Sequence, residues 1–196
     1  TAEECWMHNT PLPAAVLGRY ILEPHWLKGF RDVPTITVSD STAESLARFG
    51  VKNTIVAPEG FDPPAFLPDV QKEERPTIVW CARLVHYKRP QDLQAAVEIV
   101  RKSIPDLQVW FIGAGPNLEK LREDAPAGVE YLGFVSNEEK LERMARAHVH
   151  VATSVREGWG LVVSEAAAVG TPTIAYDTPG LRDSTKAANG VICPPN

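Results

Sequence analysis

Short apolar segments that alternate with helical segments constrain the fold of this chain more than any other feature. The strand segments are rich in Val, Ile, Thr and aromatic residues, and their connections to the helices are short. Strands that alternate with helices form a parallel sheet that is covered on both faces. The sequence therefore predicts an α/β protein with a doubly wound, Rossmann-like parallel sheet. The predicted strands are 35–39, 53–57, 77–81, 107–112, 129–132, 148–154, 173–176 and 190–193.

Helix starts are marked by capping signals. Ser41 to Glu44 and Ser136 to Glu139 are capping boxes, in which Ser and Glu satisfy free amides of the first turn. Pro90 opens another helix, whose apolar residues recur at helical spacing. The first 34 residues have no clear period, and only a short helix is expected there. The predicted helices are 16–22, 41–50, 90–100, 116–124, 136–145 and 161–169.

Composition limits the class of protein. With 196 residues and 44% hydrophobic content, the chain holds one sizeable α/β domain, or one domain and part of another. Its formal net charge of −5 argues against a general surface for nucleic acid or anionic membranes. Cys5, Cys81 and Cys193 lack metal-ligand spacing, which indicates incidental thiols in a reducing compartment. No signal peptide or membrane-spanning run is visible, and we expect a cytoplasmic protein.

Residues 156–172 form the most informative stretch, at a predicted transition from strand to helix. Gly158 and Gly160 let the backbone approach a ligand, and the following helix presents free amides and its positive dipole end. This arrangement suits a phosphate. Glu157 and Glu165 then flank one ligand, whose sugar hydroxyls their carboxylates can bind. Taken singly, each acid is more simply a solvated loop charge or a favourable partner of the helix dipole.

Two cations follow the predicted strand at 77–81. Arg83 and Lys88 lie where open α/β sheets bind ligands, outside the carboxyl end of a strand. The simpler interpretation is a pair of surface cations beside a helix start, which is an unfavourable place for positive charge. We therefore interpret them as a clamp for a diphosphate.

Two further patterns have structural explanations. Gly113 and Gly115 lack the third glycine of a dinucleotide fingerprint, because Leu118 stands there, so a tight turn and a ligand-facing loop have equal weight. His148 and His150 share one face of a predicted strand, as two metal ligands do. No third ligand with suitable spacing is visible, and we interpret both as structural histidines.

The combined motifs resemble those of a known family. The run Glu157-Gly158-Trp159-Gly160-Leu161, with Ser164-Glu165-Ala166, Gly170 and Thr171-Pro172, resembles the Glu-x7-Glu signature of the retaining family-4 glycosyltransferases, or glycosyl transferases group 1. Arg83 and Lys88 resemble that family's Arg-x4-Lys pattern. A third run matches at Ser39, Gly60 and Asp62, although Glu59 stands where the family usually has Asn. Members of this family have the two-domain GT-B fold.

The resemblance implies a role for each of these residues. Arg83 and Lys88 stabilise negative charge on a departing diphosphate, Glu157 orients the hydroxyls of the donor sugar, and Glu165 binds the ribose. Phe134 belongs to the base-binding loop, although it is equally consistent with a core position. The resemblance implies no metal and no cofactor. The remaining binding residues, which act mostly through backbone atoms, are Gly158, Trp159, Gly160, Leu161 and Val162 for the diphosphate, and Gly133 and Val135 for the base.

The same resemblance implies the domain organisation. Residues 63–196 are the nucleotide-sugar binding domain, the C-terminal half of a GT-B fold, truncated at its C-terminus, and residues 1–62 are the tail of the acceptor-side domain and a linker. The intact enzyme transfers a sugar from a nucleoside diphosphate sugar to a sugar, glycolipid or small-molecule acceptor, with retention. The chain is then a fragment that is inactive alone. Nucleic acid is not an expected partner, whereas peripheral membrane association through the missing domain is.

Other function classes remain open. Nucleotide-sugar epimerases and glycosidic phosphorylases share the GT-B architecture, and product analysis with and without acceptor distinguishes them. A non-catalytic nucleotide-sugar binding module is a further alternative, although the presence of Arg83, Lys88, Glu157 and Glu165 argues against a degenerate site. The residue types leave the nucleotide base, the donor sugar and the acceptor open.

Overall fold

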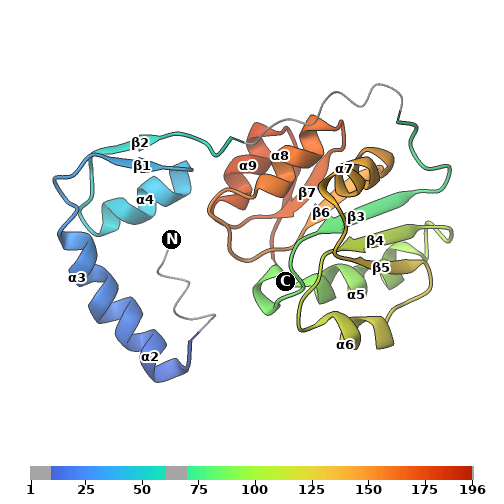
Figure 1. Ribbon diagram of the computed structural model, residues 1–196, viewed down its shortest axis with the longest axis horizontal. Coiled ribbons are helices and arrows are strands. Elements are labelled where there is room, and N and C mark those ends of the chain that lie inside the picture. The colour runs from blue at the N-terminus through green and yellow to red at the C-terminus, as the bar shows by residue number, and fades with distance from the viewer. Residues whose placement is uncertain (1–9, 61–69, 196) are drawn as a thin grey trace.

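A computed structural model describes residues 10–60 and 70–195 of the chain. Figure 1 shows a larger region built on a six-stranded sheet and a smaller N-terminal region beside it. All neighbouring strands of the large sheet run parallel, in the order β5-β4-β3-β6-β7-β8. These strands are β3 (Thr77–Cys81), β4 (Gln108–Ile112), β5 (Val129–Gly133), β6 (Val149–Ala152), β7 (Thr173–Tyr176) and β8 (Val191–Cys193). The predicted doubly wound parallel sheet is confirmed.

Helices cover both faces of this sheet (Figure 1). On one face, α5 (Pro90–Val100) and α6 (Leu118–Glu123) pack against Trp80 and Phe111. On the other face, α7 (Asn137–Arg146) and α8 (Leu161–Ala168) pack against Val79 and Trp110. Because side chains alternate along a strand, neighbouring residues such as Val79 and Trp80 enter opposite layers of the core. The helix α9 (Leu181–Ala187) continues the second layer beside β7 and β8.

The smaller region contains a two-stranded parallel sheet and helices. The strands are β1 (Thr35–Thr37) and β2 (Thr54–Val56), and α4 (Asp40–Arg48) connects them. Before β1, α2 (Leu12–Leu17), a π-helical turn at Gly18–Leu22 and α3 (Glu23–Lys28) follow one another without a break. The backbone amide of Ser41 donates a hydrogen bond of 3.1 Å to Asp183 in α9, so the two regions touch at the N-terminus of α4.

The helices differ from the sequence predictions at three places. The helix expected at 16–22 is present, but it is part of a longer helical segment that begins at Leu12, where Pro13 lies in the first turn and its missing N–H costs nothing. The N-cap of α4 is Ser39, which accepts from the amide of Thr42, and not Ser41. The helix α9 was not predicted, because it buries small hydroxyl residues, including Ser184, and shows no apolar period.

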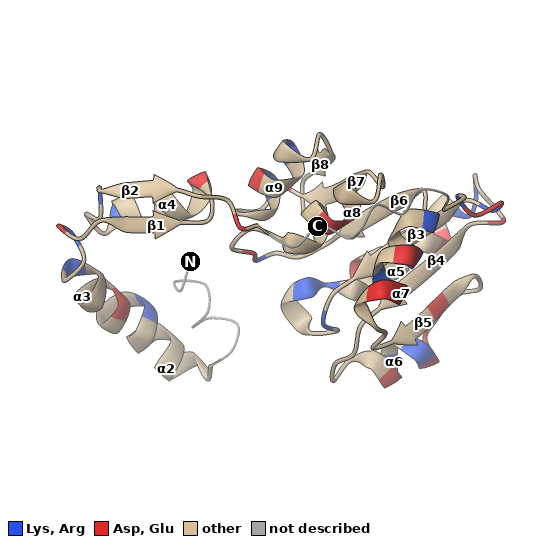
Figure 2. Cartoon of the chain, turned by 45° about the horizontal axis from the view of Figure 1, so that its top comes forward, with Lys and Arg blue, Asp and Glu red and all other residues tan. Residues whose placement is uncertain are grey.

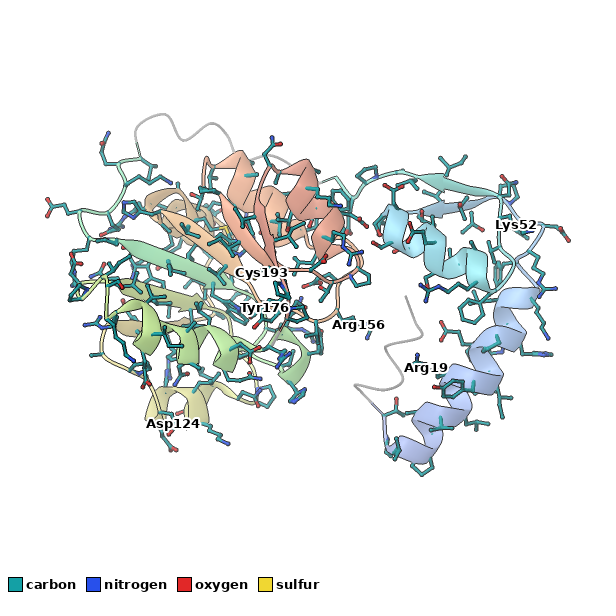
Figure 3. All side chains as sticks on the ribbon, turned by 180° about the vertical axis from the view of Figure 1, so that it is seen from behind. Arg19, Lys52, Asp124, Arg156, Tyr176 and Cys193 are labelled. Carbon is teal, nitrogen blue, oxygen red and sulfur yellow. The ribbon has the colours of Figure 1, made fainter. Side chains whose placement is uncertain are left out.

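Charged side chains lie on the outside of the helices (Figure 2), and side chains fill the space between the helices and the sheet (Figure 3). Figure 2 shows basic and acidic residues interspersed over the helices of both layers. Figure 3 shows side chains filling the space between sheet and helices, with Tyr176 and Cys193 at the carboxyl ends of the paired strands β7 and β8. Within the described residues, no helix has the length and apolar character that crossing a membrane requires. Cys5 and Asp62, which the sequence analysis names, lie outside the described residues.

Candidate functional site

The strand order defines where a ligand site is expected. After β3 the chain moves outward through β4 and β5, and it then returns to place β6 on the other side of β3. Open α/β sheets bind ligands outside the carboxyl ends of the strands at this kind of reversal, called the topological switch point. The loops that follow β3 and β6, residues 82–89 and 153–160, meet there. Both loops carry the residues that the sequence analysis selected.

A cavity of about 360 Å³ lies between these two loops, and we call it the glutamate-loop cavity. It brings together eight of the predicted site residues, from the loop that carries the two cations and from the glycine-containing loop that carries Glu157. Sequence analysis did not select its other lining residues, Glu59, Cys81, Ala82 and Tyr87. The eight predicted residues are Arg83, Lys88, Glu157, Gly158, Trp159, Gly160, Leu161 and Val162.

A second cavity, of about 470 Å³, adjoins the first because both are lined by Cys81, Ala82 and Arg83. We call it the Phe134 cavity. Phe134 and Val135 line it, and the Phe134 side chain is 89% exposed, so its alternative assignment to the core was wrong. The remaining lining residues are Ile112, Gly113, Ala114, Ser136, Asn137 and Lys140. The two cavities together extend along the carboxyl edge of β3.

The helix α8 begins at the wall of the glutamate-loop cavity. Its N-cap is Gly160, with a φ of 91°, a backbone conformation that side chains rarely allow. A methyl group added there would also lie 3.2 Å from atoms of Leu181 and Ser184. The first amides of α8, at Leu161 and Val162, have no partner within the helix, and both residues line the cavity. The predicted helix start at the site is therefore confirmed in its geometry.

Two ion pairs neutralise the acids and lysines around the cavities. Lys88 donates to Glu157 across the glutamate-loop cavity, and both side chains are about 15% exposed. Lys140 of α7 donates to Glu165 of α8 at 2.7 Å, with 19% of each side chain exposed. Both predicted acids are therefore ion-paired with lysines in this structure. Arg83 is exposed, and its guanidinium donates to the Tyr87 hydroxyl at 2.8 Å.

Glu165 and Gly133 line neither cavity. Glu165 reaches the Phe134 cavity only through Lys140, which does line it. The Gly133 carbonyl accepts a 2.7 Å hydrogen bond from the amide of Gly113, and a methyl group on Gly113 would approach the Ala82 carbonyl oxygen to 1.9 Å. Close packing of neighbouring loops explains Gly113, as the tight-turn interpretation requires, although Gly113 also faces the cavity.

Cys81 lies at the end of β3, where the two cavities meet. Burial raises the pKa of its thiol to about 12, because the charged thiolate loses its hydration, and the nearby Lys140 offsets only part of this effect. A thiol of that pKa is protonated at neutral pH and is a poor nucleophile. Cys81 therefore serves as a small apolar wall of the site.

His148 directly precedes β6 and His150 lies within it, and both form hydrogen bonds within the fold. His150 is completely buried, and its Nδ1 lies 3.0 Å from the Thr173 hydroxyl, as the structural interpretation predicts. Burial lowers the pKa of His150 to about 4, so the ring is neutral at pH 7. His148 accepts a hydrogen bond from the amide of Thr77. Among residues 10–60 and 70–195, no group of three or more His, Cys, Asp or Glu side chains is arranged to hold a metal ion.

The sequence analysis did not select three residues that line the cavities, namely Lys140, Tyr87 and Glu59. Lys140 follows the capping box at Ser136 by one turn, which places its side chain beside the loop that ends β5. Tyr87 stands between the two predicted cations, and Glu59 lies on the turn that departs from the family pattern. Nothing in the spacing of these residues indicates that Tyr87 and Glu59 share a cavity with Glu157, or that Lys140 lines the adjoining cavity.

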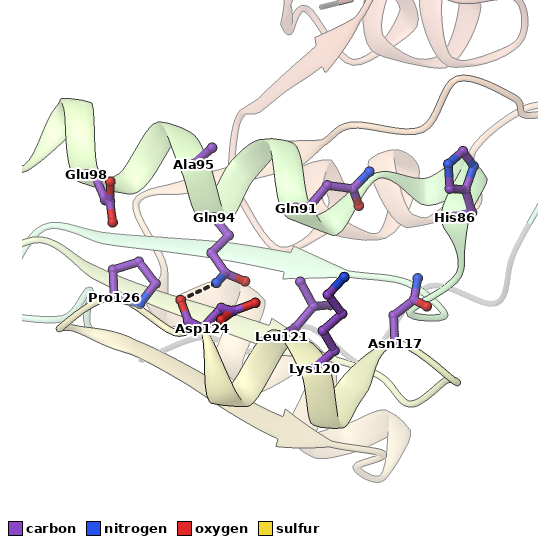
Figure 4. Close-up of a pocket in the computed structure, with 10 residues that line it drawn as sticks. All are labelled: His86, Gln91, Gln94, Ala95, Glu98, Asn117, Lys120, Leu121, Asp124 and Pro126. Atoms are coloured by element: carbon purple, nitrogen blue, oxygen red, sulfur yellow. Dashed lines mark hydrogen bonds between the residues drawn. The ribbon is translucent and has the colours of Figure 1, made fainter.

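A third cavity lies away from the switch point. Figure 4 shows this groove between α5 and α6, which we call the α5–α6 groove, with a volume of about 540 Å³. Its lining residues are mainly polar, and they lie on the two helices or on the segments beside the helix ends. They are His86, Gln91, Gln94, Ala95, Glu98, Asn117, Lys120, Leu121, Asp124 and Pro126.

The fold and the position of the cavities define a Rossmann-like α/β domain of the kind found in GT-B glycosyltransferases. TarM from S. aureus superposes with a TM-score of 0.73 at 20% identity, covering 88% of this chain and 36% of TarM. HepE from Anabaena, crystallised with UDP and glucose, gives a TM-score of 0.65 at 18% identity over 82% of this chain and 49% of HepE. These similarities establish the fold.

The sequence comparison identifies the family. The profile described as Glycosyl transferases group 1 matches residues 66–196, which is more than half of the chain. The chain belongs to this family. A GDP-mannose-dependent alpha-(1-6)-phosphatidylinositol monomannoside mannosyltransferase from Mycobacterium tuberculosis is 30% identical over 178 residues, covering 79% of this chain and 46% of that protein. A human protein named as one subunit of phosphatidylinositol N-acetylglucosaminyltransferase is 24% identical, covering 96% of this chain and 45% of its own length. The chain thus spans less than half the length of these relatives.

Proposed function

We propose that this chain is the donor-binding part of a retaining glycosyltransferase that takes its sugar from a nucleoside diphosphate sugar. One observation carries the proposal. At the switch point, a single cavity is lined by Arg83, Lys88, Glu157 and the start of α8. Cations and free helix amides together are the donors that a diphosphate requires.

The ion pair between Lys88 and Glu157 balances the two charges that face the cavity. A diphosphate entering the cavity competes with Glu157 for the Lys88 ammonium. The Glu157 carboxylate is then free to accept hydrogen bonds from the hydroxyls of the donor sugar. Arg83, on the same wall, adds a second positive charge. Each well-placed donor that stabilises charge on the departing diphosphate contributes on the order of 3 kcal/mol to catalysis.

The proposed mechanism needs no carboxylic acid on the leaving group. In glycoside hydrolysis one carboxyl group protonates the departing oxygen, whereas a nucleoside diphosphate departs as a stable anion. Glu157 and Glu165 are therefore assigned to binding, of the sugar and of the ribose respectively. The positive charges of Arg83 and Lys88 replace a metal ion, and we propose that donor binding is metal-independent.

The adjoining Phe134 cavity is the proposed place of the nucleotide base. Its lining combines the exposed Phe134 ring with Val135, Ile112 and the backbone of Gly113 and Ala114. The mannosyltransferase relative is named as GDP-mannose-dependent, and HepE was crystallised with UDP, so both nucleotides are appropriate probes.

The smaller region is the proposed tail of an acceptor-side domain, with the donor domain at 63–196. Parallel sheets are normally covered on both faces. In β1 and β2, however, Ile36 is 73% exposed and Ile55 is 60% exposed. This exposure supports the proposal that other parts of the whole enzyme cover this sheet face. We propose that the enzyme is cytoplasmic, with peripheral membrane association through its acceptor-side domain.

A ligand panel tests the donor site. UDP, GDP and ADP are added singly to the chain with EDTA, and the melting temperature is followed. A nucleotide at about 100 times its dissociation constant stabilises a protein by roughly 2.7 kcal/mol, which is a readily measured shift. If none of the three raises the melting temperature at millimolar concentration, the proposed donor site is wrong.

The chain alone is expected to bind donor without transferring sugar. Positioning of two reactants accounts for roughly 7–11 kcal/mol of a barrier, and the proposed acceptor-side loops are not part of this sequence. Release of UDP or GDP from the matching nucleotide sugars is followed with and without a mixture of acceptors. Acceptor-dependent release at an ordinary enzymatic rate would show that residues 1–62 already provide an acceptor site, against the proposed domain assignment.

A further inference from the structure

A single buried hydroxyl connects the two loops that form the glutamate-loop cavity. Thr153 directly follows the last residue of β6 and is 4% exposed. Its Oγ1 accepts a hydrogen bond of 3.0 Å from the indole N–H of Trp80 in β3. The same oxygen lies 2.8 Å from the carbonyl oxygen of Lys88 and 2.9 Å from that of Arg89, and it donates to this pair. One side chain on the β6 loop therefore fixes two consecutive peptide groups of the β3 loop.

The peptide groups that Thr153 contacts have an unusual conformation. Arg89 has φ 49° and ψ 50°, which is the left-handed region, and a residue with a side chain adopts this region only at an energetic cost. Such a conformation persists only where the surrounding structure holds it. The hydroxyl of Thr153 contacts the carbonyl groups on both sides of the Arg89 α-carbon. Because the indole N–H of Trp80 occupies a lone pair of Oγ1, the hydroxyl proton is left to point toward these carbonyls.

A backbone hydrogen bond strengthens the same connection. The amide of Val155 donates to the carbonyl of Tyr87 at 2.9 Å, one residue before Lys88. Beyond these contacts, the two loops meet again at the ion pair of Lys88 with Glu157. The Lys88 ammonium is at the end of a flexible side chain, so its place in the cavity depends on where its backbone is held. Thr153 and Val155 hold that backbone.

We propose that Thr153 is a positioning residue of the diphosphate site, which acts through the backbone of Lys88 and Arg89 and does not itself contact the ligand. The inference rests on the proposed function, because it assigns Lys88 to the diphosphate. It predicts that removing the hydroxyl displaces Lys88 and weakens contacts to phosphate while leaving contacts to the nucleoside. A purely structural role for Thr153 predicts instead that both kinds of contact weaken equally.

Two substitutions at one position test the proposal. Thr153→Val keeps the size of the side chain and removes the hydroxyl, whereas Thr153→Ser keeps the hydroxyl and removes a methyl group. Affinities for UDP, GDP, uridine and guanosine are measured by isothermal titration. We expect Thr153→Val to bind the better diphosphate about tenfold more weakly, since small displacements of a binding group have effects of this size or larger. Nucleoside affinity stays within about twofold, and Thr153→Ser restores diphosphate affinity to within about threefold.

Hydrogen exchange gives a readout that needs no nucleotide. The amides of Lys88 and Arg89 donate to Val85 and His86, and the amide of Val155 donates to Tyr87. We expect these three amides to lose protection in Thr153→Val and to keep it in Thr153→Ser. If Thr153→Val does not fold, Trp80→Phe replaces it, because it removes the N–H that orients the hydroxyl and should give the same separation of diphosphate from nucleoside.

The possible results separate this inference from the function on which it rests. If the unmodified chain binds neither UDP nor GDP, the proposed function fails, and hydrogen exchange alone decides whether Thr153 positions the loop. If Thr153→Val keeps both diphosphate affinity and amide protection, the positioning role is overturned. Equal weakening of diphosphate and nucleoside in Thr153→Val, without rescue by Thr153→Ser, also overturns it.

Discussion

The α5–α6 groove and the two switch-point cavities differ in the interactions that their polar side chains make. The groove is the larger, at about 540 Å³ against about 470 and 360 Å³. Its central polar residue is already satisfied within the fold. Gln94 donates to the Asp124 carbonyl at 2.6 Å (Figure 4), and its side-chain oxygen also accepts from the Tyr131 hydroxyl. The amide at the centre of the groove is therefore engaged by the fold.

At the switch point, by contrast, charged groups from distant parts of the sequence converge. Lys88 and Glu157 are 69 residues apart in sequence and form an ion pair across the glutamate-loop cavity. Lys140 and Glu165 form a second pair from two helices. Such pairs can exchange partners when an anion and a polyhydroxylated group enter. The comparison teaches that sheet topology and convergent charge, more than cavity volume, support the switch point as the proposed site.

The largest expected effect is a loss of nucleotide affinity on substitution of a lysine in the glutamate-loop cavity, compared with substitution of a lysine in the α5–α6 groove. Lys88→Ala removes a cation from the glutamate-loop cavity and leaves Glu157 without its partner, facing the phosphates. A hydrogen bond to a charged group contributes about 1.5–3 kcal/mol, so we expect UDP or GDP to bind roughly 10- to 100-fold more weakly. Isothermal titration measures the change.

Lys120→Ala is the matched control, because Lys120 is an exposed lysine that lines the α5–α6 groove. Its loss should leave nucleotide affinity unchanged. If Lys120→Ala weakens the diphosphate as much as Lys88→Ala does, the groove binds the nucleotide and the comparison is reversed.

The next largest effect is the pH dependence of folding stability that His150 in the large sheet causes. The pKa of His150 is about 4 in the folded state against 6.5 ordinarily, because burial disfavours the charged ring. Between these values the unfolded chain binds a proton that the folded chain does not. The stabilisation is therefore complete above about pH 6.5 and is lost as the pH falls toward 4, by about 2 kcal/mol between about pH 7.5 and pH 5.

His150→Gln removes this titration, and Gln retains a group that can hydrogen-bond to Thr173. Urea unfolding at the two pH values should show a smaller loss of stability for His150→Gln than for the unmodified chain. His25→Gln, at an exposed histidine, is the control and should retain the full loss. Carboxylates contribute to acid unfolding in all three proteins, so only the difference is informative. An identical pH dependence in all three would mean that His150 is charged or accessible in the folded state.

A smaller effect distinguishes the proposed roles of Lys88 and Glu165. Glu165→Ala removes the proposed ribose contact and releases Lys140. We expect uridine and UDP, or guanosine and GDP, to weaken by about the same factor, roughly fivefold, since the lost contact is common to both ligands. This pattern contrasts with Lys88→Ala, which should spare the nucleoside. Equal loss of nucleoside affinity in the two variants would contradict the assignment of Lys88 to the phosphates and of Glu165 to the ribose.

Much of this arrangement follows from local sequence signals. Strands such as Thr77–Cys81 and Thr173–Tyr176 have the predicted bounds, because apolar segments flanked by turn residues form buried parallel strands. Arg83, Lys88 and Glu157 were placed together correctly, because the carboxyl ends of parallel strands share one edge.

The pairing of these charges could not be predicted. Whether Glu165 faces a ligand or Lys140 depends on how α7 packs against α8, which is a tertiary property. The contact of Thr153 with Lys88 likewise depends on a left-handed Arg89, a conformation that its sequence neighbours do not signal. The helix α9 escaped prediction because its buried side chains include Ser184 and Thr185, which leave no apolar period.

The smallest expected effect tests whether the α5–α6 groove is structural. Tyr131 of β5 stacks on Phe111 at 4.7 Å between ring centroids, and its hydroxyl donates to Gln94. Burial raises the pKa of the Tyr131 hydroxyl further above its ordinary value, so it remains a neutral donor at all accessible pH values. Tyr131→Phe keeps the stacked ring and leaves the buried Gln94 oxygen without this donor, which should destabilise the fold by about 1 kcal/mol. Nucleotide affinity should not change, because the groove's polar groups serve α5, α6 and β5. Urea unfolding measures the first quantity and titration with UDP or GDP the second. A change in nucleotide affinity without a change in stability would show that the groove belongs to the binding site after all.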